Sequence, residues 1–69
     1  MNLYPVKSNN ILYTGYDEIN QILKIEFKLH VIHHYLEVPI QQFVDLMKAD
    51  DIDQFYFDFI QYHYHFEVY

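Results

Sequence analysis

Cysteine and arginine are both absent from this 69-residue sequence. The absence of cysteine excludes a disulfide framework and a zinc site built on thiolates. The absence of arginine and a net charge of -6 argue against a general nucleic-acid binder, because affinity for phosphates comes mainly from Lys and Arg. No uninterrupted apolar run approaches the ~20 residues that span a bilayer. We therefore expect a cytoplasmic protein that makes no membrane contact.

Aromatic residues are abundant instead, with 8 Tyr and 6 Phe making up 20% of the chain. A chain this short buries only ~60% of its unfolded surface, so a core without disulfides is marginal. Each aromatic ring can bury roughly 150–250 Å², which compensates for the short length. The length allows one small domain, and we expect residues 1–69 to form it.

The first half of the chain has the pattern of an antiparallel meander. Strands are predicted over 11–16, 22–27 and 31–35, after an extended lead-in at residues 1–9. In the middle strand Leu23, Ile25 and Phe27 share one face, while Lys24 and Glu26 share the other. The loop 28–30 is short enough for a hairpin.

The second half predicts two helices and a strand. One helix begins at Val38-Pro39 and ends at Ala49, and its apolar stripe comprises Ile40, Phe43, Val44 and Met47. Asp50 and Asp51 can cap a second helix, whose stripe comprises Ile52, Phe55, Tyr56, Phe59 and Ile60. From Tyr62 the period becomes two, with Tyr62, Tyr64, Phe66 and Val68 on one side and His63, His65, Glu67 and Tyr69 on the other. The fold class is therefore α+β: a three-stranded antiparallel meander followed by two short helices and an aromatic C-terminal strand. Phe27, Phe43 and Phe59 are predicted to be buried.

Several short signatures, in this order and without gaps, resemble the KTSC domain, a family named for its occurrence at the C-terminus of some lysyl-tRNA synthetases and also found as a stand-alone protein. The opening Ser8-Asn9-Asn10-Ile11 and Gly15-Tyr16-Asp17 look like its first two motifs. The later matches are Leu23-x-Ile25-x-Phe27, His33-His34-Tyr35, Val38-Pro39, the set Ala49, Phe55, Tyr56 and Ile60, and Tyr64-His65-Phe66. The resemblance covers about Val6 to Phe66.

The sequence departs from the family pattern at three places. Leu29-His30 stands where Asn-Gly is common in the second hairpin, and Asp53 stands where the family has Gly before the second helix. Gln61 and His63 replace Lys or Arg. The resemblance implies RNA binding through stacking on His33, Tyr35, Tyr64 and Phe66, but the loss of basic residues weakens that alternative.

Two clusters invite a metal or catalytic interpretation. His63 and His65 would share a strand face, and with His30, His33 or His34 could complete a three-His site. However, such a pair is commoner as solvated surface, and we predict no metal and no cofactor. Helix capping explains much of the acidic cluster, which comprises Asp50, Asp51, Asp53 and Asp58. Ser8 and Thr14 have no evident base nearby in sequence, so we predict no catalytic residue and no enzyme.

Phe57 lies about 100° from Tyr56 on the second helix, off the apolar stripe. It either packs under the terminal strand or anchors a contact. The leading hypothesis is a non-catalytic interaction module whose acidic, aromatic surface binds another protein or a second copy, most simply as a homodimer. An inhibitor encoded by a mobile element would fit this size. The predicted partner-binding residues are Phe57, Tyr62, His63, His65 and Tyr69. The alternatives are single-stranded RNA binding, and a pocket for a small nucleotide or a metal.

Overall fold

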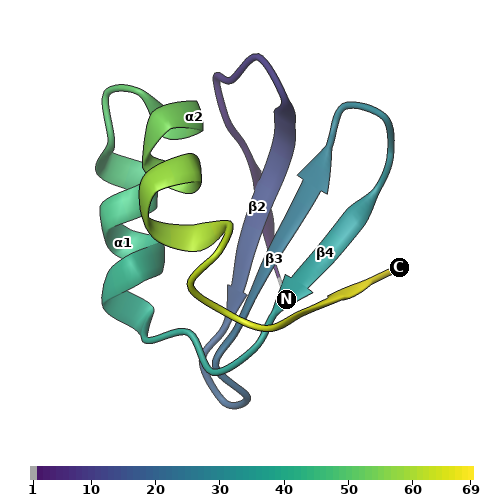
Figure 1. Ribbon diagram of the computed structural model, residues 1–69, viewed down its shortest axis with the longest axis vertical. Helices are drawn as coiled ribbons and strands as arrows, with labels where there is room; N and C mark the ends of the chain where they lie inside the picture. Colours follow the sequence, from purple (N-terminus) through teal and green to yellow (C-terminus); the bar gives the residue numbers. More distant parts are fainter. Residues whose placement is uncertain (1) are drawn as a thin grey trace.

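The computed structural model describes residues 2–69. It consists of a five-stranded antiparallel sheet with helices on one face (Figure 1). The strands lie in sequence order: β1 (Leu3–Pro5), β2 (Ile11–Asp17), β3 (Ile22–Phe27), β4 (Ile32–Tyr35) and β5 (Phe66–Val68). The α+β class and the meander β2-β3-β4 are confirmed. The sheet has five strands instead of the predicted three, because the unpredicted β1 and the predicted C-terminal strand, β5, pair with the two edges of the meander.

The expectation of a lead-in without regular structure over residues 1–9 is wrong for Leu3–Pro5, which form β1, while residue 1 lies outside the described residues. Leu3 lies opposite Gly15 and Pro5 lies opposite Tyr13. Three residues are too few for a periodic signal, and Pro5 disfavours a strand except at a sheet edge, where its missing N–H costs nothing. The pairing with β2 therefore creates β1.

Helix α1 (Ile40–Lys48) begins after Pro39 and ends at Ala49, as predicted. Its buried side differs from the prediction, because Leu46 is fully buried while Ile40 is 46% exposed. Apolar residues between 40 and 47 fit two overlapping stripes, and packing on the sheet selects the one that includes Leu46. Phe43 and Met47 are partly buried beside it.

Helix α2 (Ile52–Phe55) continues directly into a π-helical turn, η1 (Tyr56–Ile60). The predicted cap forms, since the Asp51 carboxylate accepts a hydrogen bond from the Gln54 N–H at 3.0 Å. The π turn closes when Gln61 N–H donates to the Tyr56 carbonyl at 2.9 Å. This wider turn adds a residue, so Ile60 is buried and Phe59 is left 48% exposed. The predicted burial of Phe59 is wrong for that reason.

The core lies between the sheet and the helices. Its fully buried apolar side chains are Ile11, Leu23, Ile25, Tyr35, Val38, Leu46 and Ile60. Phe27 and Phe43 are partly buried and pack against this cluster. The predicted facing of β3 is confirmed, since Leu23 and Ile25 have no exposed surface.

The terminal strand is shorter than the predicted 62–69. Residues 61–64 form a turn and a bend, after which the chain crosses the lower ends of the strands as drawn in Figure 1, and β5 then lies beside β4. The alternation within β5 is as predicted, but His63 lies outside any strand. Among the helices of residues 2–69, none is long and apolar enough to cross a membrane.

Candidate functional site

An open groove of about 510 Å³ lies between the tip of the β3–β4 hairpin and η1. We call it the hairpin groove. Its walls consist of Asn10, Phe27, Lys28, Leu29, Val31, His33, Asp53, Tyr56, Phe57 and Gln61. The volume falls within the range of about 300–1,000 Å³ that is typical of binding pockets. Most of the wall is aromatic or aliphatic, with Lys28 and Asp53 as its two charged groups.

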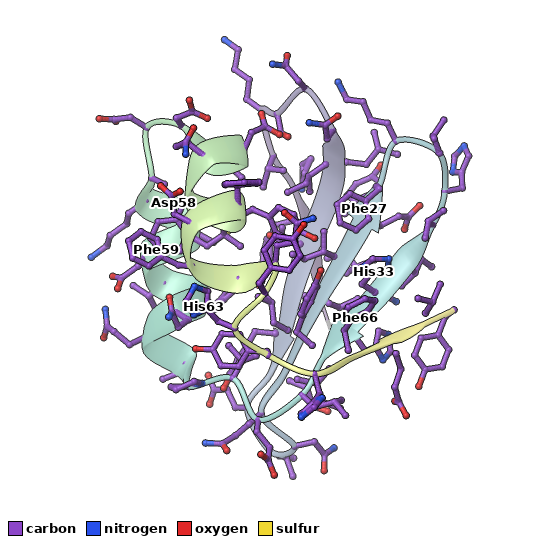
Figure 2. All side chains as sticks on the ribbon, in the orientation of Figure 1. Phe27, His33, Asp58, Phe59, His63 and Phe66 are labelled. Atoms are coloured by element: carbon purple, nitrogen blue, oxygen red, sulfur yellow. The ribbon has the colours of Figure 1, made fainter. Side chains whose placement is uncertain are left out.

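A row of three rings crosses the sheet on the side that faces the helices. Phe27 meets His33 edge to face at 4.9 Å between ring centroids, and His33 stacks on Phe66 at 4.7 Å with 14° between the planes. Figure 2 shows the three side chains in sequence from β3 to β4 to β5. The register produces the row, because neighbouring strands place these residues on one face.

A chain of hydrogen bonds connects His33, in the middle of the row, to two tyrosine hydroxyl groups. His33 Nδ1 lies 3.1 Å from the Tyr35 hydroxyl, which lies 2.6 Å from the Tyr56 hydroxyl. Burial lowers the pKa of His33, which favours the neutral ring, and an unprotonated Nδ1 can accept a hydrogen bond from the Tyr35 hydroxyl. Burial also raises the pKa of Tyr35 and that of Tyr56, so both phenols stay protonated. These bonds fix the ring of His33 in the groove wall.

Exposed apolar side chains surround the opening of the groove. Leu29 is 87% exposed on the hairpin, and Phe57 is 57% exposed on η1. Tyr62 lies next to Phe57, with 6.3 Å between the ring centroids and 82° between the planes. This arrangement leaves Phe57 uncovered by the terminal strand and in the groove wall.

The predicted partner-binding residues divide between two surfaces. Phe57 lines the groove with Tyr62 beside it. His63, in the turn after η1, places its Nε2 2.9 Å from the carbonyl oxygen of Asp58, and Figure 2 labels both residues. Tyr69 instead packs on His34, 4.2 Å between centroids, and its hydroxyl donates to Glu67. Since His65 and Tyr69 alternate with Phe66 and Val68, they lie on the opposite face of the sheet.

The residues of the RNA alternative are not equally available. Tyr35 is fully buried and cannot stack on a base, which is a correction to the prediction. Tyr64 is half-buried against the core, whereas Phe66 is 46% exposed. The surface that remains for stacking is therefore the pair His33 and Phe66.

The expected shared face of His63 and His65 does not form, because His63 belongs to a turn. Across residues 2–69, no three His, Asp or Glu side chains are placed to hold a metal ion together. In the acidic cluster Asp51 caps α2 and Asp58 accepts a hydrogen bond from Gln54 Nε2 at 3.0 Å. Capping and helix-surface hydrogen bonds therefore account for these two side chains.

Asp53 has a role that the sequence analysis missed. Its carboxylate accepts hydrogen bonds from Ser8 Oγ at 2.6 Å, Asn9 N–H at 3.0 Å and Asn10 Nδ2 at 3.3 Å. Ser8 Oγ in turn accepts from the N–H groups of Asn10 and Ile11. This clamp joins α2 to the start of β2 and forms one end of the hairpin groove. Adjacent polar residues at 8–10 and a carboxylate in place of Gly were the signal available in the sequence.

Comparisons with known proteins agree with this fold. The model of the KTSC domain family matches residues 7–64. The chain belongs to the KTSC domain family. The crystal structure of a KTSC domain protein from Yersinia pestis superimposes with a TM-score of 0.92 at 30% identity, over 96% of this chain and 93% of that one. A protein from Tsukamurella paurometabola is 38% identical over 53 residues, which are 77% of this chain and 79% of its own length.

One departure from the KTSC pattern shapes the groove. At Leu29-His30, His30 adopts a left-handed φ of 65°, and its N–H donates to the Phe27 carbonyl at 2.8 Å. The turn therefore forms without the Asn-Gly that is common in the family. Because Leu29 replaces a polar turn residue, it adds an exposed aliphatic side chain to the edge of the hairpin groove.

Proposed function

We propose that this KTSC domain is a non-catalytic interaction module that binds another protein through the hairpin groove. The observation that carries the proposal is an open aromatic groove flanked by exposed Leu29 and Phe57. Exposed apolar side chains gathered around a concave surface are typical of binding sites, and rings supply much of the energy of such contacts.

The hydroxyl groups considered as nucleophiles support a non-catalytic role. Ser8 Oγ donates a hydrogen bond to Asp53 and accepts hydrogen bonds from two backbone N–H groups, and all three bonds belong to the clamp. Thr14 is fully buried, and its hydroxyl lies 2.9 Å from Met47 Sδ. Neither hydroxyl contacts a histidine that could act as a base.

The groove favours a short segment with an apolar or aromatic anchor. Phe27 and Phe57 supply apolar contact, and Gln61 supplies an amide that can bond to a peptide backbone. Lys28 and Asp53 lie in the same groove, so it carries charges of both signs. A segment with an apolar anchor and mixed charge would complement these walls.

Two single aspartate variants, one at the tip of the groove hairpin and one at the tip of another hairpin, test the proposal. Peptides selected from a displayed random library on the unmodified protein should carry an apolar or aromatic anchor. Their affinity, measured by fluorescence anisotropy, should fall at least about tenfold for Leu29→Asp, because a charge then enters the edge of the groove. Ile19→Asp is the matched control, since Ile19 is 92% exposed in the β2–β3 turn and does not line the groove.

Two results would contradict the proposal. One is that no peptide is enriched above background. The other is that selected peptides bind Leu29→Asp and Ile19→Asp equally well. Circular dichroism of both variants establishes that each remains folded.

A second candidate function is the binding of single-stranded RNA or a nucleotide. The stacked pair of His33 and exposed Phe66 supports it, because a base can stack on an aromatic ring without sequence preference. The shortage of cations opposes it, since Lys28 is the one Lys among the groove residues.

A further inference from the structure

The two edges of the sheet differ in their protection against pairing. The β1 edge contains Pro5, which has no N–H to offer a partner strand. In contrast, β5 contains neither proline nor a bulge. Its charged residue, Glu67, accepts a hydrogen bond from the Tyr69 hydroxyl at 2.8 Å. The β5 edge therefore lacks a proline or a bulge, and its protection is limited to its length of three residues and the charge of Glu67.

The hydrogen bonds between β4 and β5 show which backbone groups face outward. Tyr69 and Ile32 exchange both bonds, and Leu36 N–H donates to the His65 carbonyl. Bonded positions alternate in an antiparallel pair, so residues 65, 67 and 69 bond inward. The N–H and C=O groups of Phe66 and Val68 consequently point away from β4. Their side chains are 46% and 60% exposed.

We propose that β5 pairs in antiparallel fashion with β5 of a second copy of this chain, with Phe66 opposite Phe66. This surface is separate from the hairpin groove, so the proposal goes beyond the function proposed above. The two sheets would join into one, and the aromatic row Phe27–His33–Phe66 would continue into the same row of the second copy. Aromatic pairs directly opposite each other stabilise neighbouring strands.

Charge selects this register over its neighbour. If Phe66 lies opposite Val68 of the second copy, the two Glu67 side chains face each other, and like charges in that position are destabilising. If Phe66 lies opposite Phe66, His65 faces Glu67 at both ends of the contact. A histidine can hydrogen-bond to a carboxylate when neutral and pair with it when protonated. The same register places Tyr64 opposite Val68, an apolar match. A self-complementary edge of this kind favours a second copy over a foreign strand.

Single cysteine variants can read this register, because the chain contains no cysteine of its own. In the proposed register, His65 of one copy and Glu67 of the other form a non-hydrogen-bonded pair. The Cα atoms of such a pair are about 4.5 Å apart, a distance that suits a disulfide. An equimolar mixture of His65→Cys and Glu67→Cys should oxidise to a covalent heterodimer at least about tenfold faster than either variant alone. Ile19→Cys, in a distant exposed turn, measures random collision.

Sedimentation of the unmodified protein provides an independent measurement. A concentration-dependent dimer is expected, and Val68→Pro should shift it to monomer because proline removes an outward N–H that β4 does not use. If Glu67→Cys alone forms the covalent dimer faster than the mixture does, Glu67 lies opposite Glu67, and the proposed register is wrong. A mixture that links no faster than Ile19→Cys, together with a monomer at hundreds of micromolar, would overturn the pairing. The hairpin-groove proposal would stand after either result, since its peptides bind a different surface.

Discussion

Gly15, Tyr16 and Asp17, the residues of the most compact KTSC signature, each hold a different part of the fold. A side chain at Gly15 would place a Cβ 2.5 Å from the Asn2 carbonyl oxygen and 2.8 Å from Leu3 Cδ2, so glycine permits β1 to approach. The Tyr16 hydroxyl donates to the Val38 carbonyl, and its ring stacks on Phe43. Asp17 accepts hydrogen bonds from Ile19 and Asn20 in the β2–β3 turn. Each residue of the signature therefore has a structural role in the fold.

The Asp53 clamp leads to a prediction about pH. Burial raises the pKa of Asp53, but hydrogen bonds from Ser8, Asn9 and Asn10 outweigh it, and the net pKa lies below the ordinary value. The charged form therefore contributes stability above the unfolded pKa of about 3.9, and that stability is lost as pH falls through the lower folded pKa.

Asp53→Asn should accordingly reduce the free energy of unfolding by about 1–3 kcal/mol near neutral pH. The deficit should shrink below about pH 4, because the unmodified protein then loses the same charge. Urea unfolding at about pH 7 and about pH 3 measures both effects. Asp50→Asn makes the same charge change at an exposed neighbour and should cost only a few tenths of a kcal/mol. Equal losses for the two variants would mean that the clamp contributes no stability.

At the scale of elements, the π turn exposes one aromatic residue, Phe59, that an α-helical pattern would bury. An uninterrupted α-helix would place Phe59 on the buried stripe with Phe55 and Tyr56. The wider turn keeps Ile60 buried but leaves Phe59 exposed, whereas Phe57 lies off the stripe in either case. π turns are frequent at functional sites, and here the turn supplies the Phe57 wall of the hairpin groove.

Alanine substitutions at adjacent positions test this helical phase. Ile60→Ala should lower the free energy of unfolding by about 2–5 kcal/mol, because it opens a cavity in the core. Phe59→Ala should cost about 1 kcal/mol or less, since half of its surface is exposed and it loses mainly its contact with Phe55. Chemical denaturation of both variants measures the difference. A larger loss for Phe59→Ala would show that the α-helical phase continues through this turn.

At the scale of the whole molecule, charge sets the expectation for RNA. Ten acidic residues oppose four lysines, giving a net charge of -6. We predict that a random single-stranded oligonucleotide binds more weakly than about 10⁻⁴ M at physiological salt. Anisotropy titrations at two salt concentrations provide the measurement. Micromolar binding that weakens steeply with salt would instead favour the RNA alternative, with His33 and Phe66 as its stacking surface.

Much of the local structure follows from the sequence alone. The period of two in residues 22–27 predicts β3 and its buried face, and Pro39 and Asp51 mark where helices begin. The exposure of Phe57 also follows from its angular position on the helix. These features depend on backbone geometry within a few residues, so a pattern can predict them.

The tertiary structure decided the rest. Tertiary contacts pair Leu3–Pro5 with β2 and bury the Leu46 side of α1. They also select the π turn that exposes Phe59, and they bury Tyr35. The tertiary structure also brings the hairpin tip beside η1 to form the hairpin groove. Each outcome is a choice between alternatives that are nearly equal locally, such as two overlapping stripes or a free or paired edge. Contacts between residues far apart in the chain make that choice, because they bury the most apolar surface while satisfying buried polar groups.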